Sequence, residues 1–223
     1  MSNNPPDALL FTTPGCPHCR TVLQGLDELV KQGVVAKLTV VDATEHPEQA
    51  EEYGVRAAPW LRLGPFTLTG AHSPAELRLW AEWAKGEEGI ARYVTHLLQE
   101  GGYQHAAAFI AADPQRLKPL LAIIANPEAN ISVRLGVSGL LEAYANTADL
   151  QKLLPQLADL TNHEDHRVRA DACYLLGLTG SSGACAYVAE CLDDTNEEVR
   201  EIAEEAMDIL ANKCSKRQAM LAR

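Results

Sequence analysis

The sequence lacks long apolar stretches and is poor in basic residues. The longest apolar run covers residues 106–112 and is mostly alanine, whereas a helix that spans a bilayer needs about 20 apolar residues. The first seven residues have neither the basic nor the apolar region of a secretory signal peptide. Nineteen lysines and arginines face 30 aspartates and glutamates, a formal net charge of −11. We therefore expect a cytoplasmic protein that binds neither membranes nor nucleic acid.

The sequence contains six cysteines. We do not expect them to form a disulfide framework, because cytosolic thiols are kept reduced. Three of the six, Cys173, Cys185 and Cys191, lie on apolar faces of expected helices, where we expect them to pack in the core. Cys214 lies in a basic tail and is the candidate for a minor reactive thiol. No second C-x-x-C pair and no histidine pair at metal spacing occurs. We expect neither a metal nor another cofactor.

The first part of the 223-residue chain alternates strand and helix patterns. Short apolar or β-branched runs predict four strands, at residues 9–13, 34–41, 60–63 and 66–69. Apolar spacing and capping signals predict three helices, at residues 19–31, 47–53 and 74–85. Thr44 is expected to cap the second helix, and Ser73 with Glu76 forms a capping box for the third. The order β-α-β-α-β-β-α indicates a small α/β domain, which we place at residues 1–86.

Beyond a polar segment with two glycines at residues 85–89, the pattern is helical throughout. A Val-Arg pair followed by small and apolar residues recurs at Val133, Val168 and Val199, each time after an acidic or amide turn. This resembles HEAT-like helical repeats, and we expect each arginine to interact with an acidic turn of a neighbouring repeat. Residues 87–223 are therefore predicted to form an all-α HEAT-like repeat domain, an α-solenoid whose surface binds a protein substrate or partner.

The motif that carries chemistry is Cys16-Pro17-His18-Cys19, which follows the first strand and opens the first helix. At a helix N-terminus, free N–H groups and the helix dipole favour a thiolate, and His18 can add positive charge. We assign Cys16 as the nucleophile, Cys19 as the residue that resolves a mixed disulfide, and Pro17 with His18 as residues that tune the thiol. A chance pair of cysteines, or half of a zinc site, is the alternative.

The strand–C-x-x-C–helix arrangement, the element order and the dipeptide Ala58-Pro59 before the third strand resemble the thioredoxin superfamily. In that family the proline is cis, and the residue before it offers backbone hydrogen bonds to a substrate peptide. The resemblance assigns substrate binding to Ala58 and Pro59. The C-P-H-C motif is similar to that of DsbA-type oxidases, while the small core looks more like glutaredoxin.

The chain departs from the superfamily pattern at three places. Gly15 stands where thioredoxins have tryptophan, and Leu10 stands where they have a buried carboxylate. Residues 69–72 replace the glycines and acidic residue that hold glutathione in glutaredoxins. The resemblance therefore implies dithiol chemistry without an in-domain proton acceptor and without support for glutathione binding.

Together these patterns imply an enzyme of cell redox homeostasis. We expect a thiol–disulfide oxidoreductase that acts on protein disulfides, with the repeats recruiting the protein substrate and a reductase or oxidant regenerating the dithiol. The alternative is a HEAT-like protein-binding adaptor or redox-regulated scaffold, in which the thioredoxin-like domain is a switch or docking surface. An intact C-x-x-C favours the enzyme.

Overall fold

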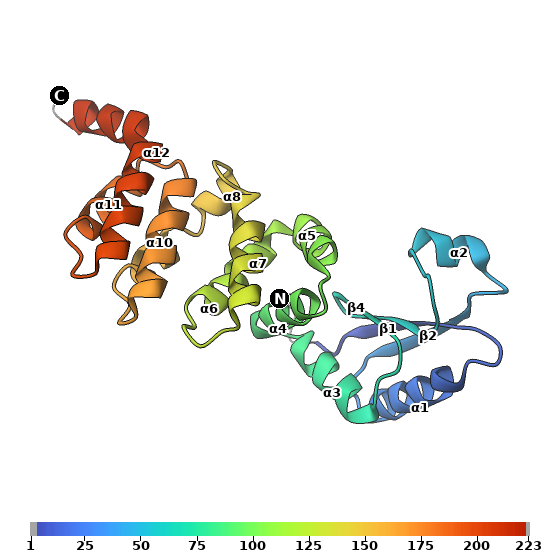
Figure 1. Cartoon of the computed structure of the whole chain (residues 1–223). Helices are drawn as coiled ribbons and strands as arrows, with labels where there is room; N and C mark the ends of the chain where they lie inside the picture. Colours follow the sequence, from blue (N-terminus) through green and yellow to red (C-terminus); the bar gives the residue numbers. More distant parts are fainter. Residues whose placement is uncertain (1–3, 222–223) are drawn as a thin grey trace. The chain divides into compact units, whose positions relative to one another are not determined.

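The computed structural model describes residues 4–221, which form two compact units that divide between Tyr93 and Val94 (Figure 1). The first unit contains a four-stranded sheet and three helices, named β1 (Asp7–Thr12), α1 (Pro17–Lys31), β2 (Lys37–Asp42), α2 (Pro47–Glu52), β3 (Trp60–Leu63), β4 (Phe66–Thr69) and α3 (Pro74–Trp83). The sheet order is β2-β1-β3-β4, with β1 and β2 parallel and the other two pairs antiparallel. This confirms the predicted element order.

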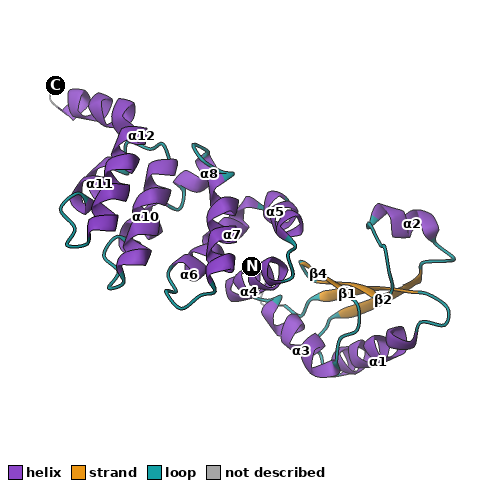
Figure 2. Cartoon of the chain, in the orientation of Figure 1, coloured by secondary structure: helices purple, strands orange, loops and turns teal. Residues whose placement is uncertain are grey.

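Both faces of the sheet are covered. Helices α1 and α3 lie together on one face, and α2 lies beyond the other (Figures 1 and 2). Alternation along β1 explains the two cores, since successive side chains of a strand point to opposite faces. Phe11 packs with Val41, Ala50 and Trp60 on the α2 side, and the fully buried Leu10 points to the other side.

Two local predictions in this unit need correction, and one is confirmed. The strand expected from Val34 begins only at Lys37, because Val34 and Val35 turn back to bond the Leu29 carbonyl at the end of α1. Thr44 does not cap α2; its N–H and hydroxyl both donate to Asp42, and α2 begins after His46. The capping box of α3 is present in both directions, between Ser73 and Glu76.

The first unit extends past α3 into helix α4 (Glu87–Gln99). The Tyr93 hydroxyl donates to the Thr67 carbonyl at 2.8 Å and accepts from the Thr67 N–H at 3.1 Å. These bonds satisfy two backbone groups of β4, which is an edge strand of the sheet. The Tyr93 ring also stacks on Phe66, with 4.7 Å between ring centroids. The start of α4 therefore completes the core beside β4.

Helices joined by turns and loops make up the described part of the second unit (Figure 2). Its further elements are α5 (Tyr103–Ala111), the 3-10 helix η1 (Pro114–Leu120), α6 (Leu121–Ile124), α7 (Ile131–Glu142), α8 (Ala148–Gln151), α9 (Leu154–Leu160), α10 (His166–Leu178), α11 (Cys185–Cys191) and α12 (Glu197–Leu221). Residues 148–160 form two short helices, α8 and α9, with Pro155 in the first turn of α9. Within residues 4–221, no helix is both long and apolar enough to cross a membrane.

The repeated Val-Arg pairs lie at the starts of α7, α10 and α12, with each valine packed in the core. Each valine is at most 2% exposed and anchors the start of its helix in the core. Arg134 pairs with Asp171 of α10, and Arg169 binds Asp194, in the turn before α12, through two hydrogen bonds of 2.8 and 2.9 Å. The predicted link between an arginine and the acidic turn of the next repeat is thus confirmed for Arg169, whereas Arg134 reaches a helical aspartate.

Candidate active site

Cys16 is the N-cap residue of helix α1. Its backbone is extended (φ −67°, ψ 113°), and its Sγ atom accepts a hydrogen bond from the Cys19 N–H at 3.1 Å. Pro17 occupies the first turn, where a missing N–H costs nothing. Gly15 has φ +75°, which favours glycine and lets the chain turn sharply from β1 into the helix. The local sequence therefore places the Cys16 sulfur at the N-terminal end of the helix dipole.

The structure joins Cys16 and Cys19 in a disulfide, with 5.4 Å between their Cα atoms. The two sulfurs differ in access: Cys16 is half-buried, whereas the Cys19 residue is only 6% exposed. Pro17 and His18 are both exposed beside them. An incoming thiol or disulfide can therefore approach Cys16 more readily than Cys19.

The Ala58–Pro59 dipeptide lies at the same end of the sheet as this disulfide. Strands β1 and β3 are antiparallel, and Phe11 pairs with Trp60, so the residue after Phe11 lies next to the residue before Trp60. The Ala58–Pro59 bond is cis, which confirms that prediction. Pro59 is buried and its carbonyl accepts from the Gly70 N–H at 3.0 Å, while Ala58 is half-buried. The topology thus brings the two predicted site segments together.

An aromatic cluster that our sequence reasoning did not assign to the site supports this end of the sheet. The rings of Phe11, Tyr53 and Trp60 lie 5.5–6.0 Å apart between centroids. The Arg62 guanidinium lies 5.0 Å from the centre of the Tyr53 ring. The signal was available in part, because Phe11 and Trp60 each lie close to a predicted site segment. Tyr53 joins them only through the placement of α2.

The position that carries a carboxylate in thioredoxins holds a fully buried leucine, Leu10. An aliphatic side chain cannot accept a proton, so the proton acceptor of those proteins has no counterpart at this position. The predicted departure from the thioredoxin pattern at Leu10 therefore means that this position holds no side-chain proton acceptor.

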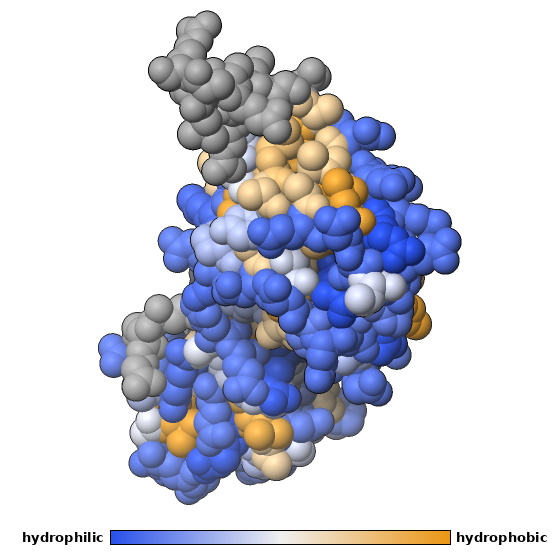
Figure 3. Space-filling view, turned by 90° about the vertical axis from the view of Figure 1, so that its left-hand side faces the viewer, coloured by the Kyte–Doolittle hydropathy of each residue, from blue (hydrophilic) through white to orange (hydrophobic). Residues whose placement is uncertain are grey.

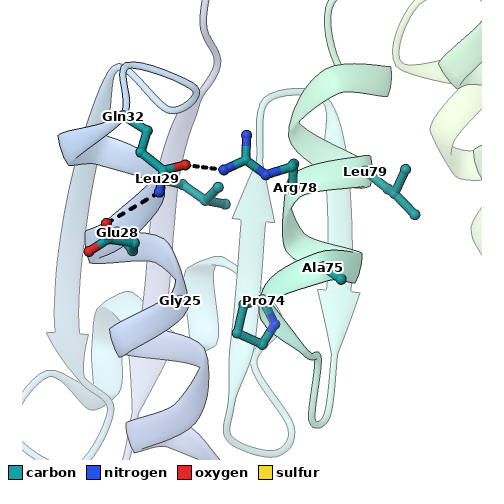
Figure 4. A pocket seen from close by; sticks show the side chains of 8 residues that line it. All are labelled: Gly25, Glu28, Leu29, Gln32, Pro74, Ala75, Arg78 and Leu79. Atoms are coloured by element: carbon teal, nitrogen blue, oxygen red, sulfur yellow. Dashed lines mark hydrogen bonds between the residues drawn. The ribbon is translucent and has the colours of Figure 1, made fainter.

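A separate pocket of about 440 Å³ lies between α1 and α3 (Figure 4). Its lining is mainly aliphatic, with a chain of hydrogen bonds from Glu28 through Gln32 to Arg78 across its rim. The residues that α1 contributes begin at Gly25, beyond the turns that carry Cys16 and Cys19. The sequence analysis did not single out this pocket, and the dithiol does not line it.

The cysteines of the second unit correct one sequence-based expectation. Cys173 and Cys191 are buried and free, as predicted, but Cys185 is bonded to Cys214 in a second disulfide, with 5.7 Å between Cα atoms. Sequence reasoning missed this pair because the partners lie on different helices, 29 residues apart. A hydrogen bond with Cys191, together with burial, raises the pKa of the Cys173 thiol, which favours its neutral form.

Comparison with known proteins identifies a thioredoxin domain at residues 9–82 and HEAT repeats at residues 117–208. A thioredoxin of Methanocaldococcus jannaschii is 35% identical over 51 residues, which are 22% of this chain and 60% of that protein. A probable thioredoxin of Methanothermobacter thermautotrophicus is 34% identical over 70 residues, which are 30% of this chain and 82% of that protein. The match thus covers less than two thirds of the length of the first relative and more than two thirds of the length of the second. It belongs to the thioredoxin family, with HEAT repeats following its thioredoxin domain.

Proposed function

We propose that this protein is a thiol–disulfide oxidoreductase that acts on protein disulfides through Cys16 and Cys19. The observation that carries the proposal is the disulfide at the N-terminus of α1, with an accessible outer sulfur and a buried inner one. The proximity of the cis-proline segment to this disulfide supports it further. Redox activity of this kind is what the thioredoxin relatives suggest in general terms.

In the reducing direction, the Cys16 thiolate attacks one sulfur of the substrate disulfide. A Cys16–substrate bond forms, the substrate S–S bond breaks, and one substrate thiolate leaves. The Cys19 sulfur then attacks Cys16 and releases the second substrate thiol, so two electrons pass from the dithiol to the substrate. Because Leu10 offers no base, we propose that the Cys19 proton passes to water or to the departing thiolate. A reductase then supplies two electrons that return Cys16 and Cys19 to the dithiol; in the oxidising direction, an oxidant partner restores their disulfide instead.

Docking of the substrate falls to Ala58 and Pro59 in this proposal. The half-buried Ala58 lies next to the disulfide end of the sheet, where its backbone can pair with an extended peptide. Pro17 and His18 tune the thiol from the exposed side of the motif. The HEAT repeats recruit the protein that carries the substrate disulfide, because repeat surfaces are extended and suited to binding.

The decisive experiment traps the substrate. A Cys19→Ser variant of the full chain retains the Cys16 nucleophile but cannot resolve the adduct, so it should accumulate disulfide-linked partners that a Cys16→Ser variant does not capture. Adducts should disappear on treatment with a reductant. If Cys19→Ser forms no more adducts than Cys16→Ser, and neither variant differs from the native chain in cleaving a small disulfide, the enzymatic proposal is wrong.

A second candidate function is a HEAT-like adaptor whose thioredoxin domain is a docking surface rather than a catalyst. Two large apolar side chains on α7, Ile131 and Leu135, are 67% and 66% exposed and offer a surface for a partner. In that case a partner should bind equally well to the Cys16→Ser/Cys19→Ser variant and to the native chain, without any disulfide link. Binding that depends on Cys16 would instead favour the enzyme.

The nucleophile should react at lower pH than an ordinary cysteine. The helix N-terminus and the Cys19 N–H stabilise the thiolate of reduced Cys16, so alkylation of Cys16 should persist well below the ordinary thiol value of about 8.5. Alkylation rate against pH, followed by mass spectrometry of the Cys16 peptide, measures this. His18→Ala should move the profile toward that of free cysteine, and a native profile equal to that of free cysteine would contradict the assigned role.

The domain division at residues 1–86 and 87–223 remains a proposal, and the Tyr93 contacts make it testable. A fragment of residues 1–93 keeps the two hydrogen bonds between Tyr93 and Thr67, and a fragment of residues 1–86 loses them. Both should cleave a small disulfide if the dithiol domain folds alone. We expect the longer fragment to unfold at higher urea concentration, as followed by tryptophan fluorescence.

A further inference from the structure

The second disulfide holds the end of the longest helix. Cys185 is the first residue of α11, and Cys214 lies on α12, near the end of the chain. Both residues are half-buried, in contrast to Cys173 and Cys191, which are buried. Of these four cysteines, the disulfide pair is therefore the one that a thiolate from outside the unit can reach.

The packing of α12 shows what this bond secures. The helix buries one stripe of small and apolar side chains, Val199, Ala203, Ala206 and Leu210, each at most 1% exposed. A Cβ atom on Gly177 of α10 would lie 2.9 Å from that of Ala206, so α10 and α12 approach closely there. Cys214, four residues after Leu210, continues the stripe. Beyond Leu210, a covalent bond ties α12 to α11.

The surface around this end is partly apolar. Figure 3 looks onto the end of the repeat unit that carries α11 and α12, and a hydrophobic area interrupts the mostly hydrophilic surface of this face. Ile209, in the middle of α12, is 50% exposed. A change in how α12 is held against α11 would therefore act on a face of the unit proposed to bind proteins that carries exposed apolar side chains.

We propose that the Cys185–Cys214 disulfide is a substrate of this protein's own Cys16–Cys19 dithiol, and that its opening releases the end of α12 from α11. The proposal rests on the thiol–disulfide function proposed above. The Cys16 thiolate attacks one sulfur of the pair, forms a mixed disulfide and breaks the Cys185–Cys214 bond. Cys19 then attacks Cys16, and two electrons and two protons have passed to Cys185 and Cys214. An external dithiol restores Cys16 and Cys19.

The test compares the native full chain with its Cys16→Ser variant under limiting dithiothreitol. Thiols are alkylated at intervals, and mass spectrometry of the Cys185 and Cys214 peptides measures how fast the bond opens. We expect opening at least tenfold faster in the native chain. Cys19→Ser should accumulate a disulfide between Cys16 and either Cys185 or Cys214, and its presence within one chain or between two copies distinguishes the two routes.

Two controls separate this inference from the proposed function. The native chain is assayed in parallel on a small disulfide, and the Cys185→Ser/Cys214→Ser variant should retain that activity. Amide hydrogens at the end of α12 should exchange faster in this variant than in the native chain, by a larger factor than those of α7. Equal opening rates in the native and Cys16→Ser chains, with the small disulfide cleaved normally, would overturn the inference alone. Loss of both reactions in the native chain would overturn the proposed function with it.

Discussion

Replacing Arg169 with alanine should destabilise the repeat unit strongly. The Arg169 guanidinium donates from Nε and Nη2 to the two carboxylate oxygens of Asp194, at 2.8 and 2.9 Å. Its Nη1 donates to the carbonyls of His163 and Glu164 at 2.9 and 3.0 Å. One side chain therefore joins the turn before α10 to the turn before α12.

The magnitude follows from burial. The Arg169 and Asp194 side chains are only 15% and 11% exposed, so the pair is well shielded from water. Removing one partner of a buried ion pair costs about 3–5 kcal/mol, because the other charge is left without compensation. Asp194 keeps a hydrogen bond from the Asn196 N–H at 2.8 Å. We therefore expect the lower end of that range, about 3 kcal/mol.

The matched control lies two residues away. Arg167 on the same helix pairs with Asp165, but its side chain is 49% exposed, so Arg167→Ala should cost less than about 1 kcal/mol. All three tryptophans, Trp60, Trp80 and Trp83, lie in the first unit. Urea unfolding followed by circular dichroism at 222 nm then reports mainly the helical repeats, and tryptophan fluorescence reports the thioredoxin unit.

We expect Arg169→Ala to lower the circular dichroism midpoint by about 1–2 M urea, with the fluorescence midpoint nearly unchanged. Hydrogen bonding from Arg169 holds the pKa of Asp194 below its ordinary value of 3.8. This stabilisation is present above pH 3.8 and is lost as pH falls through the lower folded-state pKa, so the difference between native and variant should shrink in acid. Equal effects of Arg167→Ala and Arg169→Ala at pH 7 would refute the reasoning.

Three further changes test other parts of the fold. Tyr93→Phe removes both hydrogen bonds to Thr67 and should lower the free energy of unfolding of the first unit by about 1–2 kcal/mol, measured by tryptophan fluorescence in urea. Ser73→Ala breaks the capping box of α3 and should cost about 1 kcal/mol by the same measurement; no change would argue against the cap. Cys185→Ser/Cys214→Ser removes a disulfide whose partners lie 29 residues apart, and it should lower the free energy of unfolding of the repeat unit by up to about 3.5 kcal/mol, measured by circular dichroism in urea. An unchanged midpoint would mean that the bond holds only the end of α12.

Much of the thioredoxin unit follows from the sequence because its decisive signals are local. A strand, a turn glycine at Gly15 and a helix that starts at Cys16 involve contacts within a few residues. The Ser73–Glu76 capping box spans three residues. The repeats were recognisable for a related reason, since each Val-Arg pair meets the same local environment at the start of its helix. Thr44 shows the limit of such local signals. Its N–H and hydroxyl donate to Asp42 two residues earlier, so it does not cap α2.

Sequence patterns alone were therefore enough to predict the order of the elements, the helical repeats and the position of the C-x-x-C motif at a helix start. Tertiary structure decided what depends on elements that meet from far along the chain. Tyr93 binds Thr67 across 26 residues, and Cys185 bonds to Cys214 across 29. Hydrophobic periodicity tells which face of a helix is buried but not which partner it meets. The second disulfide became visible only once α11 and α12 were packed side by side.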